Sequence, residues 1–441
     1  MNEAEKAMGD AGKKMYAICE ELFPICRSIT GDGVRETFQI LKKYYEDIKI
    51  CEIPCGTQVF DWTIPKEWNI KDAYIEDEKG ERVVDFGENN LHVLGYSAPI
   101  DAKIELSELL EHVYTLPDQP ELIPYTTSYY KERWGFAMSE IQKNSLKPGM
   151  YHAVIDSSFT DGSLTYGEIL IPGKSDKEIF ISTYICHPSM ANNECSGPAL
   201  AVMLANYIRS MSERKYSYRI VFVPETIGSI TYLSQNLDYL KSHVIAGFNL
   251  SCVGDNRTYS VIHSRYADTM ADKVMTNVLK NHYPDYKDYS YLKRGSDERQ
   301  YQAPGVDLPL VGFCRSKYHE YPEYHTSGDN MSLVSPEGFQ GAYDVMVKCI
   351  EALEWNEKYK ITCFCEPQLG KRGLVPTMSS KKTYQQTLHL KDLLAYADGR
   401  NDLLDISNRI EAPVDFLIPL VKQLLEAELF EVCDSTQNTR E

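Results

Sequence analysis

The stretch Ile185–Pro198, which reads ICHPSMANNECSGP, carries the most chemical information in this chain of 441 residues. It follows an apolar, strand-like run at Ile179–Tyr184 and leads into a helical pattern from Pro198 to Ile208. Open α/β sheets bind ligands and metals at the carboxyl ends of their strands, and histidine is a common zinc ligand. The stretch therefore predicts an α/β sheet with a candidate metal ligand at His187. An ordinary loop before a capped helix is the alternative for these residues alone.

Two downstream segments favour the metal site, because each also follows a strand-like run. Glu225 ends the apolar run that begins at Ile220. A carboxylate enclosed by apolar strands has a raised pKa, as a general base requires. His325 lies in a loop whose polar neighbours can orient its second ring nitrogen, as metal-bound imidazoles require. Together the three segments predict a metallohydrolase.

Strand-like runs alternate with helical patterns over the centre of the chain, which indicates a parallel or mixed α/β sheet. The runs are Val154–Ile155, Glu168–Ile171, Ile179–Thr183, Ile220–Val223, Ala246–Leu250 and Leu310–Phe313. Before them, short alternating runs such as Arg82–Phe86 and Leu91–Tyr96 are separated by prolines and predict a small β-rich unit.

The C-terminal part has the pattern of a winged helix-turn-helix. We expect helices at Lys391–Tyr396, at Asp402–Ile410 with Asn401 as its cap, and at Val414–Glu428 with Pro413 in its first turn. A strand-like tail follows at Leu429–Val432.

The order of the His187, Glu225 and His325 segments resembles that of M28-type zinc aminopeptidases. Further motifs make the chain more similar to a bacterial aminopeptidase-like family with the domains of unknown function DUF4910 and DUF2172 and a C-terminal winged helix. These motifs are Gly33–Thr37, Phe60–Trp68, Tyr129–Phe136, Asp161–Glu168, Gly295–Tyr301 and Glu366–Leu374. The expected fold class is α/β: an M28-like zinc peptidase core with a mixed sheet, an inserted small β-rich domain and a C-terminal winged helix-turn-helix. The expected domains are 1–60 with 146–360, then 61–145, then 361–441.

Three positions depart from the two-zinc pattern that this resemblance implies. Asn193 stands where an Asp bridges the two ions, Thr226 replaces the second residue of a Glu-Glu pair, and Ser251 replaces the Asp that completes the second site. Because each change removes an acidic ligand, we expect one zinc ion.

The predicted metal ligands are His187, Asn193 and His325. A neutral amide lacks the charge of a carboxylate, so this set would hold zinc weakly. Glu194, Asp297 or Cys195 are alternatives for the third ligand. Buried cysteines such as Cys186 more often serve as small apolar residues than as zinc ligands.

Glu225 is the predicted catalytic base, which deprotonates the water that attacks an amide carbonyl. Arg133, Asp297, Arg299 and Glu320 are the predicted substrate contacts. Carboxylates suit a free α-amino group, and a guanidinium can hold a carboxylate through two hydrogen bonds. Ordinary ion-pair networks are the alternative for these residues.

Composition limits the class of partner. The net charge of −18 opposes binding to nucleic acid or anionic membranes. From Asp392 to Glu431 three basic residues face nine acidic ones, so we expect the winged helix to mediate interaction or homo-oligomerisation rather than DNA binding. No run reaches the roughly 20 apolar residues of a membrane span, and the N-terminus has no signal-peptide core. Twelve cysteines without framework spacing suggest a cytoplasmic protein.

The expected function is metal-dependent hydrolysis of an amide or peptide bond in a small peptide or other amide-bearing substrate. The family resemblance also implies a link to surface-polysaccharide synthesis. One alternative is a catalytically impaired aminopeptidase-like scaffold or ligand-binding protein, which the changes at Asn193, Thr226 and Ser251 favour. A third hypothesis, an acidic transcription regulator, depends only on the C-terminal fold.

Overall fold

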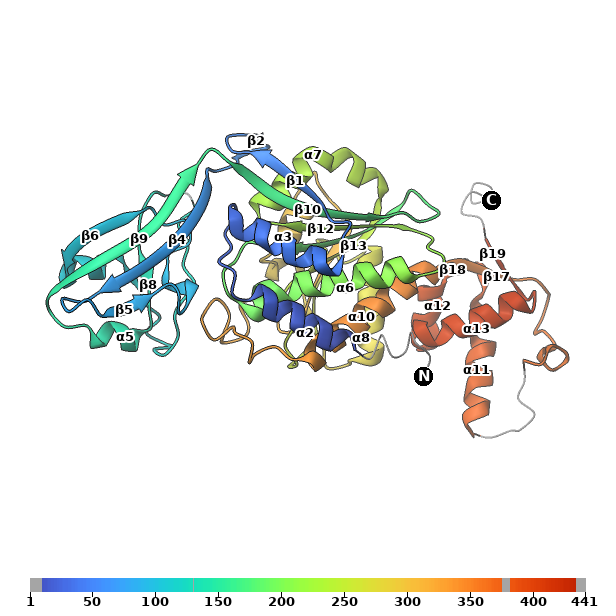
Figure 1. Ribbon diagram of the computed structural model, residues 1–441. Helices are drawn as coiled ribbons and strands as arrows, with labels where there is room; N and C mark the ends of the chain where they lie inside the picture. Colours follow the sequence, from blue (N-terminus) through green and yellow to red (C-terminus); the bar gives the residue numbers. More distant parts are fainter. Residues whose placement is uncertain (1–9, 130, 375–380, 434–441) are drawn as a thin grey trace. The chain divides into compact units, whose positions relative to one another are not determined.

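The computed structural model describes residues 10–129, 131–374 and 381–433. The chain forms two compact units (Figure 1). The first comprises Met1–Thr269 and Lys287–Tyr343, and the second comprises Met270–Tyr286 and Asp344–Glu441.

An eight-stranded mixed sheet forms the centre of the first unit, which confirms the predicted α/β class. Its strands, in spatial order, are β1 (Lys49–Pro54), β10 (Ser163–Ile171), β12 (Ser217–Val223), β11 (Glu178–Tyr184), β13 (Val244–Leu250), β16 (Leu310–Cys314), β14 (Ser260–Ile262) and β15 (Lys287–Tyr289). The four strands β12, β11, β13 and β16 run parallel, whereas β10 is antiparallel to β12 and β14 is antiparallel to β16.

Helices cover this sheet because its central strands are buried along their whole length. Every residue of β11 is buried, as is typical of parallel strands covered on both faces. Helix α6 (Ser196–Ser210) packs on β10, β11 and β12 together with α2 (Ala11–Leu22) and α3 (Asp32–Tyr44), and α7 (Ile227–His243) packs with α9 (Glu298–Tyr301) (Figure 1). A Cβ at Gly197 would lie 2.1 Å from Thr183 Oγ1. Only glycine therefore lets α6 begin this close to β11.

A smaller antiparallel sheet with its own hydrophobic core also belongs to the first unit. Its strands, in spatial order, are β5 (Arg82–Asp85), β4 (Glu67–Glu76), β9 (Met150–Thr160) and β6 (Ile100–Glu105). Shorter elements nearby in the chain are β2 (Gln58–Val59), β3 (Trp62–Thr63), α4 (Leu106–Leu109), β7 (Val113–Tyr114), β8 (Phe136–Ala137) and α5 (Glu140–Ser145). The core includes Ile75, Phe136 and Ile155. A small β-rich unit was the sequence prediction for this part of the chain.

Two strand predictions in this region were wrong. The Val154–Ile155 run was expected in the large sheet, but it lies in β9, where Val154 pairs with Tyr74 and Asp101. An apolar run shows that a strand is buried, not which sheet it joins. Leu91–Tyr96 was expected as a strand, but a 3-10 turn occupies Asn90–His92 because the Asn89 side chain accepts a hydrogen bond from the Leu91 N–H. The boundaries between the predicted domains stay predictions.

The second unit contains the winged-helix elements. Its three-stranded sheet has the order β18 (Asp398–Asp402), β17 (Lys358–Ile361) and β19 (Phe430–Val432). The helices of this part are α8 (Met270–His282), α11 (Lys381–Tyr396), α12 (Leu403–Ile410) and α13 (Val414–Glu426), and α10 (Pro336–Trp355) leads into it. The winged helix-turn-helix prediction is confirmed.

Details of the C-terminal helices differ from the prediction. The first begins at Lys381 rather than Lys391. The cap of α12 is Asp402, not Asn401, and its carboxylate accepts a hydrogen bond from the Asp405 N–H in a capping box. Pro413 precedes α13 instead of lying in its first turn, and that helix ends at Glu426.

None of the helices in the described parts of the chain has the length and apolar character that crossing a bilayer requires.

Candidate active site

The loop after β11 holds the His187 ring in a fixed orientation. His187 is buried, and its Nδ1 lies 3.2 Å from Glu194 Oε2. The same carboxylate oxygen accepts the His187 backbone N–H at 3.0 Å. A carboxylate on one ring nitrogen is the usual partner of a metal-binding histidine. This arrangement leaves Nε2 on the other side of the ring, where it lies 3.8 Å from Glu225 Oε2.

A buried arginine fixes Glu194 in this orienting role. Arg27 Nε lies 3.0 Å from Glu194 Oε1 and donates a hydrogen bond of 2.9 Å to the His187 carbonyl oxygen. Both side chains of the ion pair are about 1 % exposed, so each charge depends on the other for compensation. Glu194 therefore neighbours the site but is already committed to Arg27 and His187.

Cys186 lies next to His187 and Glu194 but makes a hydrogen bond of its own. Donor atoms of Cys186, His187 and Glu194 lie within 4.8 Å of one another. Burial raises the pKa of the Cys186 thiol well above its usual value, and the charge of Glu194 adds to this effect. The Cys186 Sγ accepts a hydrogen bond from the Glu225 N–H at 3.2 Å, so Cys186 has a structural role without a metal.

A π-helical turn at Ala191–Cys195 presents Asn193 to the site. The Asp329 carboxylate accepts the backbone N–H groups of Asn192 at 2.6 Å and Asn193 at 3.0 Å, and also the Tyr321 hydroxyl at 2.8 Å. Turns of this kind occur frequently at functional sites. Burial raises the pKa of Asp329 to about 6.

The Asn193 amide is oriented so that its oxygen remains available. Its Nδ2 donates to the Tyr184 hydroxyl at 2.6 Å and to Cys252 Sγ at 3.6 Å. Its Oδ1 is buried and has no hydrogen-bond partner in the described structure. Buried acceptors are nearly always satisfied, so this oxygen is suited to bind a group from outside the chain.

His325 offers a second buried atom of the same kind. Its ring stacks on Tyr324 with centroids 3.8 Å apart, and its Nε2 has no hydrogen-bond partner among the described residues. Burial, together with the nearby His187, lowers the pKa of His325 well below its usual value, so the ring is neutral at pH 7. A neutral imidazole with a free lone pair is the metal-binding form.

The two imidazoles lie at a separation that suits one shared metal ion. Their ring centroids are 5.4 Å apart, and two imidazoles bound to one tetrahedral zinc would have centroids roughly 5 Å apart. Tyr184 connects Asn193 to this pair, because its ring lies 5.2 Å from that of His187. Asn193 Oδ1 and His325 Nε2 are thus buried without a hydrogen-bond partner in the described structure, and the His187 ring lies beside that of His325. The assignment of these three residues as metal ligands stays a prediction.

Glu225 follows β12 in a strained turn. Thr226 has φ 66° and ψ −75°, and the Ile227 N–H donates to the Glu225 carbonyl oxygen at 2.8 Å. This is a classic γ-turn, which is rare and costly for a β-branched residue. Burial raises the pKa of Glu225, although His187 and Arg299 oppose the increase.

Asp297 stabilises this turn through hydrogen bonds. Its Oδ1 accepts the Thr226 N–H at 2.8 Å and the Ser229 hydroxyl at 2.7 Å. Burial, and then the charge of Glu225, raise the pKa of Asp297 to about 7. Arg299, which is partly exposed, donates to the Thr226 hydroxyl. Two of the predicted substrate contacts therefore lie at the turn that carries Glu225.

The other two predicted substrate contacts have no recorded contact with the site. Arg133 is exposed and donates to Ser128 Oγ at 2.9 Å and to the Thr127 carbonyl oxygen at 3.1 Å. Glu320 is exposed, and its charge helps to raise the pKa of Tyr289, after burial. Their roles in substrate binding stay predictions.

Tyr125 and Tyr129 were not predicted from the sequence. The Tyr125 ring lies 5.2 Å from that of His187 and 4.9 Å from that of His325, and its N–H donates to the His325 carbonyl oxygen at 2.8 Å. Its hydroxyl lies 2.7 Å from that of Tyr129. The only local signal was two tyrosines in the run Pro124–Tyr129, beside one of the family motifs.

Comparisons with known proteins find matches over most of the chain. A model for the family described as a domain of unknown function, DUF4910, matches residues 16–356, and a winged helix-turn-helix model matches residues 357–432. A Clostridium acetobutylicum protein, named as a candidate polysaccharide-biosynthesis protein with an aminopeptidase-like domain, is 44% identical over 409 residues, or 92% of this chain and 93% of the relative.

Solved structures match over most of the chain. The crystal structure of a candidate peptidase from Clostridium acetobutylicum is 41% identical and covers 98% of this chain and 99% of its own, with a TM-score of 0.92. Two more distant structures share the fold. A zinc aminopeptidase from Bacillus subtilis is 13% identical, covers 78% of this chain and 95% of its own, and has a TM-score of 0.57. An M28 peptidase precursor from Shewanella amazonensis is 13% identical, covers 79% of this chain and 94% of its own, and has a TM-score of 0.54. The predicted M28-like fold is confirmed.

Proposed function

The chain belongs to the DUF4910 family, and from this premise we propose that it is a zinc-dependent hydrolase of the aminopeptidase type. One observation carries the proposal. Asn193 Oδ1 and His325 Nε2 are both buried without a hydrogen-bond partner in the described structure. The His187 ring lies 5.4 Å from that of His325, and its Nε2 lies 3.8 Å from Glu225 Oε2.

His187, Asn193 and His325 would hold the metal. When bound, zinc supplies a Lewis acid that polarises a scissile carbonyl and acidifies the attacking water. A single ion is expected, because the positions that differ from the two-zinc pattern make other contacts. Thr226 accepts a hydrogen bond from Arg299, and Ser251 Oγ lies 3.6 Å from Cys314 Sγ.

The chain's own residues would move the protons. Glu225, with a pKa raised by burial, takes a proton from the attacking water and delivers it to the leaving amine. Asp297 keeps the γ-turn in place, so that the Glu225 carboxylate remains directed toward His187. Tyr125, which is half-buried, contributes an aromatic wall beside both histidines, which limits the access of bulk water.

The substrate class follows from the groups around Glu225. Arg299 offers a partly exposed guanidinium for a substrate carboxylate. Asp297, whose Oδ2 has no hydrogen-bond partner in the described structure, offers a carboxylate for an amine. The relative named for polysaccharide biosynthesis supports an amide-bearing sugar or amino-acid conjugate as well as a small peptide. Twelve free cysteines support action in the cytoplasm, and the acidic winged helix supports homo-oligomerisation.

To test this proposal, the zinc-loaded protein is assayed for hydrolysis of aminoacyl amides and N-acylated amino sugars. We expect cleavage of at least one substrate and a kcat about 10²–10⁴ times lower for Glu225→Gln, with the zinc content unchanged. Glu132→Gln changes an exposed carboxylate elsewhere and serves as the control. Equal rates for the wild type and Glu225→Gln would contradict the assigned role of Glu225.

The neutral amide of Asn193 favours a second candidate function. Without a charged ligand at this position, the fold would serve as a ligand-binding scaffold without catalysis. That candidate predicts no turnover even in Asn193→Asp loaded with zinc, whereas the hydrolase predicts turnover.

A further inference from the structure

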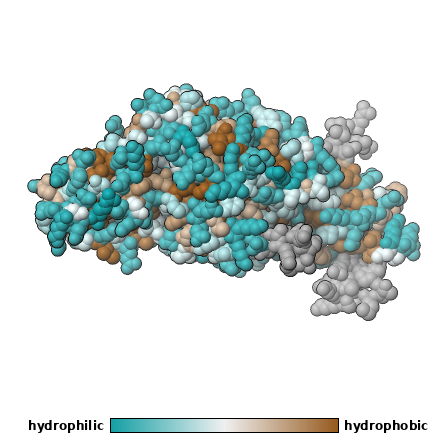
Figure 2. Space-filling view, in the orientation of Figure 1, coloured by the Kyte–Doolittle hydropathy of each residue, from teal (hydrophilic) through white to brown (hydrophobic). Residues whose placement is uncertain are grey.

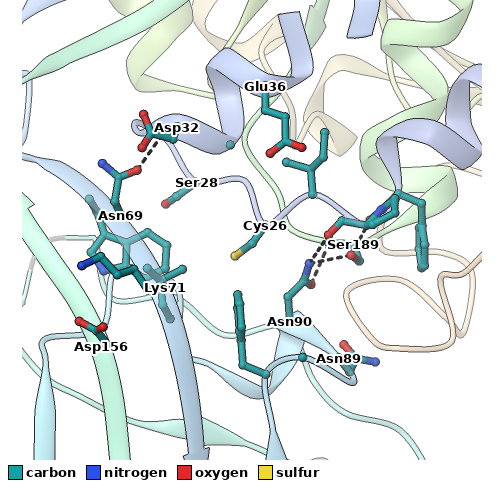
Figure 3. A pocket seen from close by; sticks show the side chains of 18 of the residues that line it. Cys26, Ser28, Asp32, Glu36, Asn69, Lys71, Asn89, Asn90, Asp156 and Ser189 are labelled. Atoms are coloured by element: carbon teal, nitrogen blue, oxygen red, sulfur yellow. Dashed lines mark hydrogen bonds between the residues drawn. The ribbon is translucent and has the colours of Figure 1, made fainter. Parts of the chain in front are cut away.

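A cavity of about 750 Å³ lies in the first unit, apart from the candidate active site. The chain between α2 and α3, the start of β4, the loop before Asn90 and part of β9 form its walls (Figure 3). Its volume is in the range of small-molecule sites. None of His187, Asn193, Glu225 and His325 lines it.

Hydrogen bonds between Asn90 and Ser189 join the cavity wall to the loop that carries His187. Ser189 donates its backbone N–H to Asn90 Oδ1 at 3.1 Å, and Asn90 Nδ2 donates to Ser189 Oγ at 2.7 Å (Figure 3). Asn90 Nδ2 also reaches the Pro24 carbonyl oxygen at 3.3 Å. These hydrogen bonds join the segments that contain Pro24, Asn90 and Ser189. The polar groups of this part of the wall therefore already have partners.

The charge of the lining is strongly acidic. It contains five carboxylates and one lysine, Lys71. Glu21 and Asp32 are neutralised by Lys43 and Arg35. The remaining three lining carboxylates form no ion pair with a described residue: Glu36, Glu88 and Asp156. This excess of negative charge favours a cationic ligand and disfavours an anionic one.

A buried hydroxyl in the same wall lacks a partner. Ser28 is 3% exposed, and its Oγ makes no hydrogen bond within the described structure. Figure 3 shows the Ser28 side chain in the cavity wall between those of Asn69 and Cys26. Most buried side-chain hydroxyls have a hydrogen-bond partner. A ligand with a hydrogen-bonding group would supply the partner that the Ser28 hydroxyl lacks.

We propose that this cavity binds a small polar molecule with a protonated amine. The unpaired carboxylates would take the ammonium group, and Ser28 would bond a neighbouring hydroxyl or amine. Trp68 and Phe86 supply aromatic lining, which suits both the carbon skeleton and a cation. An aliphatic polyamine and an amino sugar share this chemistry.

The test is isothermal titration calorimetry of the full-length protein at low ionic strength, where charge attraction is least screened. The probes are spermidine, glucosamine and the neutral analogue N-acetylglucosamine. We expect at least one amine to bind and N-acetylglucosamine not to bind. Spermidine binding alone would assign the site to polyamines, glucosamine binding alone would assign it to amino sugars, and both results support the proposal.

Variants locate the binding. The pair Glu36→Gln and Glu88→Gln should weaken amine binding on the order of tenfold, because it removes two charged acceptors. Ser28→Ala should weaken it by several fold. The matched control is Glu105→Gln with Glu132→Gln, which removes the same charge from exposed positions outside the cavity.

Three results would overturn the proposal. They are no binding of either amine, equal binding of glucosamine and N-acetylglucosamine, or equal weakening by the cavity pair and the control pair. Because no zinc ligand or catalytic group lines the cavity, loss of hydrolase activity and loss of amine binding are separate outcomes.

Discussion

At the residue level, the amide of Asn193 decides how tightly the candidate metal centre can bind. Its nitrogen is committed to the Tyr184 hydroxyl at 2.6 Å, so only the neutral oxygen is left for a metal. A carboxylate of the same shape would present a charged oxygen in the same place. The three predicted ligands would add no negative charge, and the carboxylates beside His187 are those of Glu194 and Glu225.

Replacing this amide by a carboxylate should strengthen zinc binding. We expect Asn193→Asp to lower the zinc Kd by about tenfold or more, because a buried charge pair replaces an ion–dipole contact. Competition with a chromophoric chelator measures the change. Asn144→Asp adds the same charge at an exposed position and should leave the affinity unaltered. Identical Kd values for the wild type and Asn193→Asp would show that this side chain is not a ligand.

Glu67 provides a test of pH dependence away from the metal site. Arg35 forms two hydrogen bonds with it, at 2.8 and 2.6 Å, and holds its pKa down at about 2, against an ordinary value of 4.5. Because the folded pKa is the lower one, the stabilisation is complete above about pH 4.5 and is lost as the pH falls toward 2.

Glu67→Gln should therefore cost on the order of 2 kcal/mol of stability at pH 7 and clearly less near pH 3. Urea unfolding of the wild type and the variant at both pH values measures this difference. A gap that stays constant between pH 7 and pH 3 would mean that the ion pair does not contribute through its charge.

At the level of elements, the π-helical turn at Ala191–Cys195 is the structure that positions the site. It begins where the chain leaves the loop after β11, and Asp329 from the His325 loop closes it through two backbone N–H groups. One carboxylate thus joins the segment with His187 and Asn193 to the segment with His325. The γ-turn at Thr226 positions Glu225 in a similar way, because the Asp297 carboxylate accepts the Thr226 N–H.

Asp329→Ala should destabilise this arrangement. It leaves the buried N–H groups of Asn192 and Asn193 and the Tyr321 hydroxyl without their acceptor, at a cost of about 2–5 kcal/mol in total. We expect a lower Tm and weaker zinc binding. Asp268→Ala, at an exposed position, is the control. A Tm equal to that of the wild type would contradict this role of Asp329.

Local sequence patterns predicted the strands that are buried on both faces. They missed elements that lack an apolar pattern, such as the first part of α11. The runs Ile179–Thr183 and Ile220–Val223 identified β11 and β12, because a continuous apolar run has few other uses. Helix α11 begins ten residues before the predicted start, because Lys381–Leu390 is mostly polar and lacks the apolar periodicity that indicates a helix.

The site could be predicted in part for the same reason. His187, Glu225 and His325 follow apolar runs, so their places in the chain were visible in the sequence. Tyr125 could not be found in this way, because only the folding of the chain brings it to the histidines. Arg133 has the chemistry of a substrate contact, but groups within six residues satisfy it locally.

At the level of the whole molecule, charge determines which partners are possible. The net charge is −18, and the face drawn in Figure 2 is mostly hydrophilic with scattered apolar patches. In the second unit, three carboxylates of the winged helix are paired with lysines. Lys273 contacts Asp402 and Asp405 at 2.7 Å, and Lys348 contacts Asp415 at 2.7 Å.

The winged helix should therefore not bind DNA. Fluorescence anisotropy of a labelled duplex at low salt should show no binding at micromolar protein, because a surface with an excess of carboxylates releases no counterions from the phosphates. Binding that weakens steeply with added salt would contradict this expectation and favour a regulator of transcription.

The zinc content of the untagged protein, by elemental analysis after dialysis against a defined zinc concentration, tests the proposed metal centre directly. We expect about one zinc per chain for the wild type, and far less for His325→Ala with its circular dichroism spectrum unchanged. No retained zinc in a folded wild type, or equal zinc in His325→Ala, would contradict the assignment of His187, Asn193 and His325 as ligands.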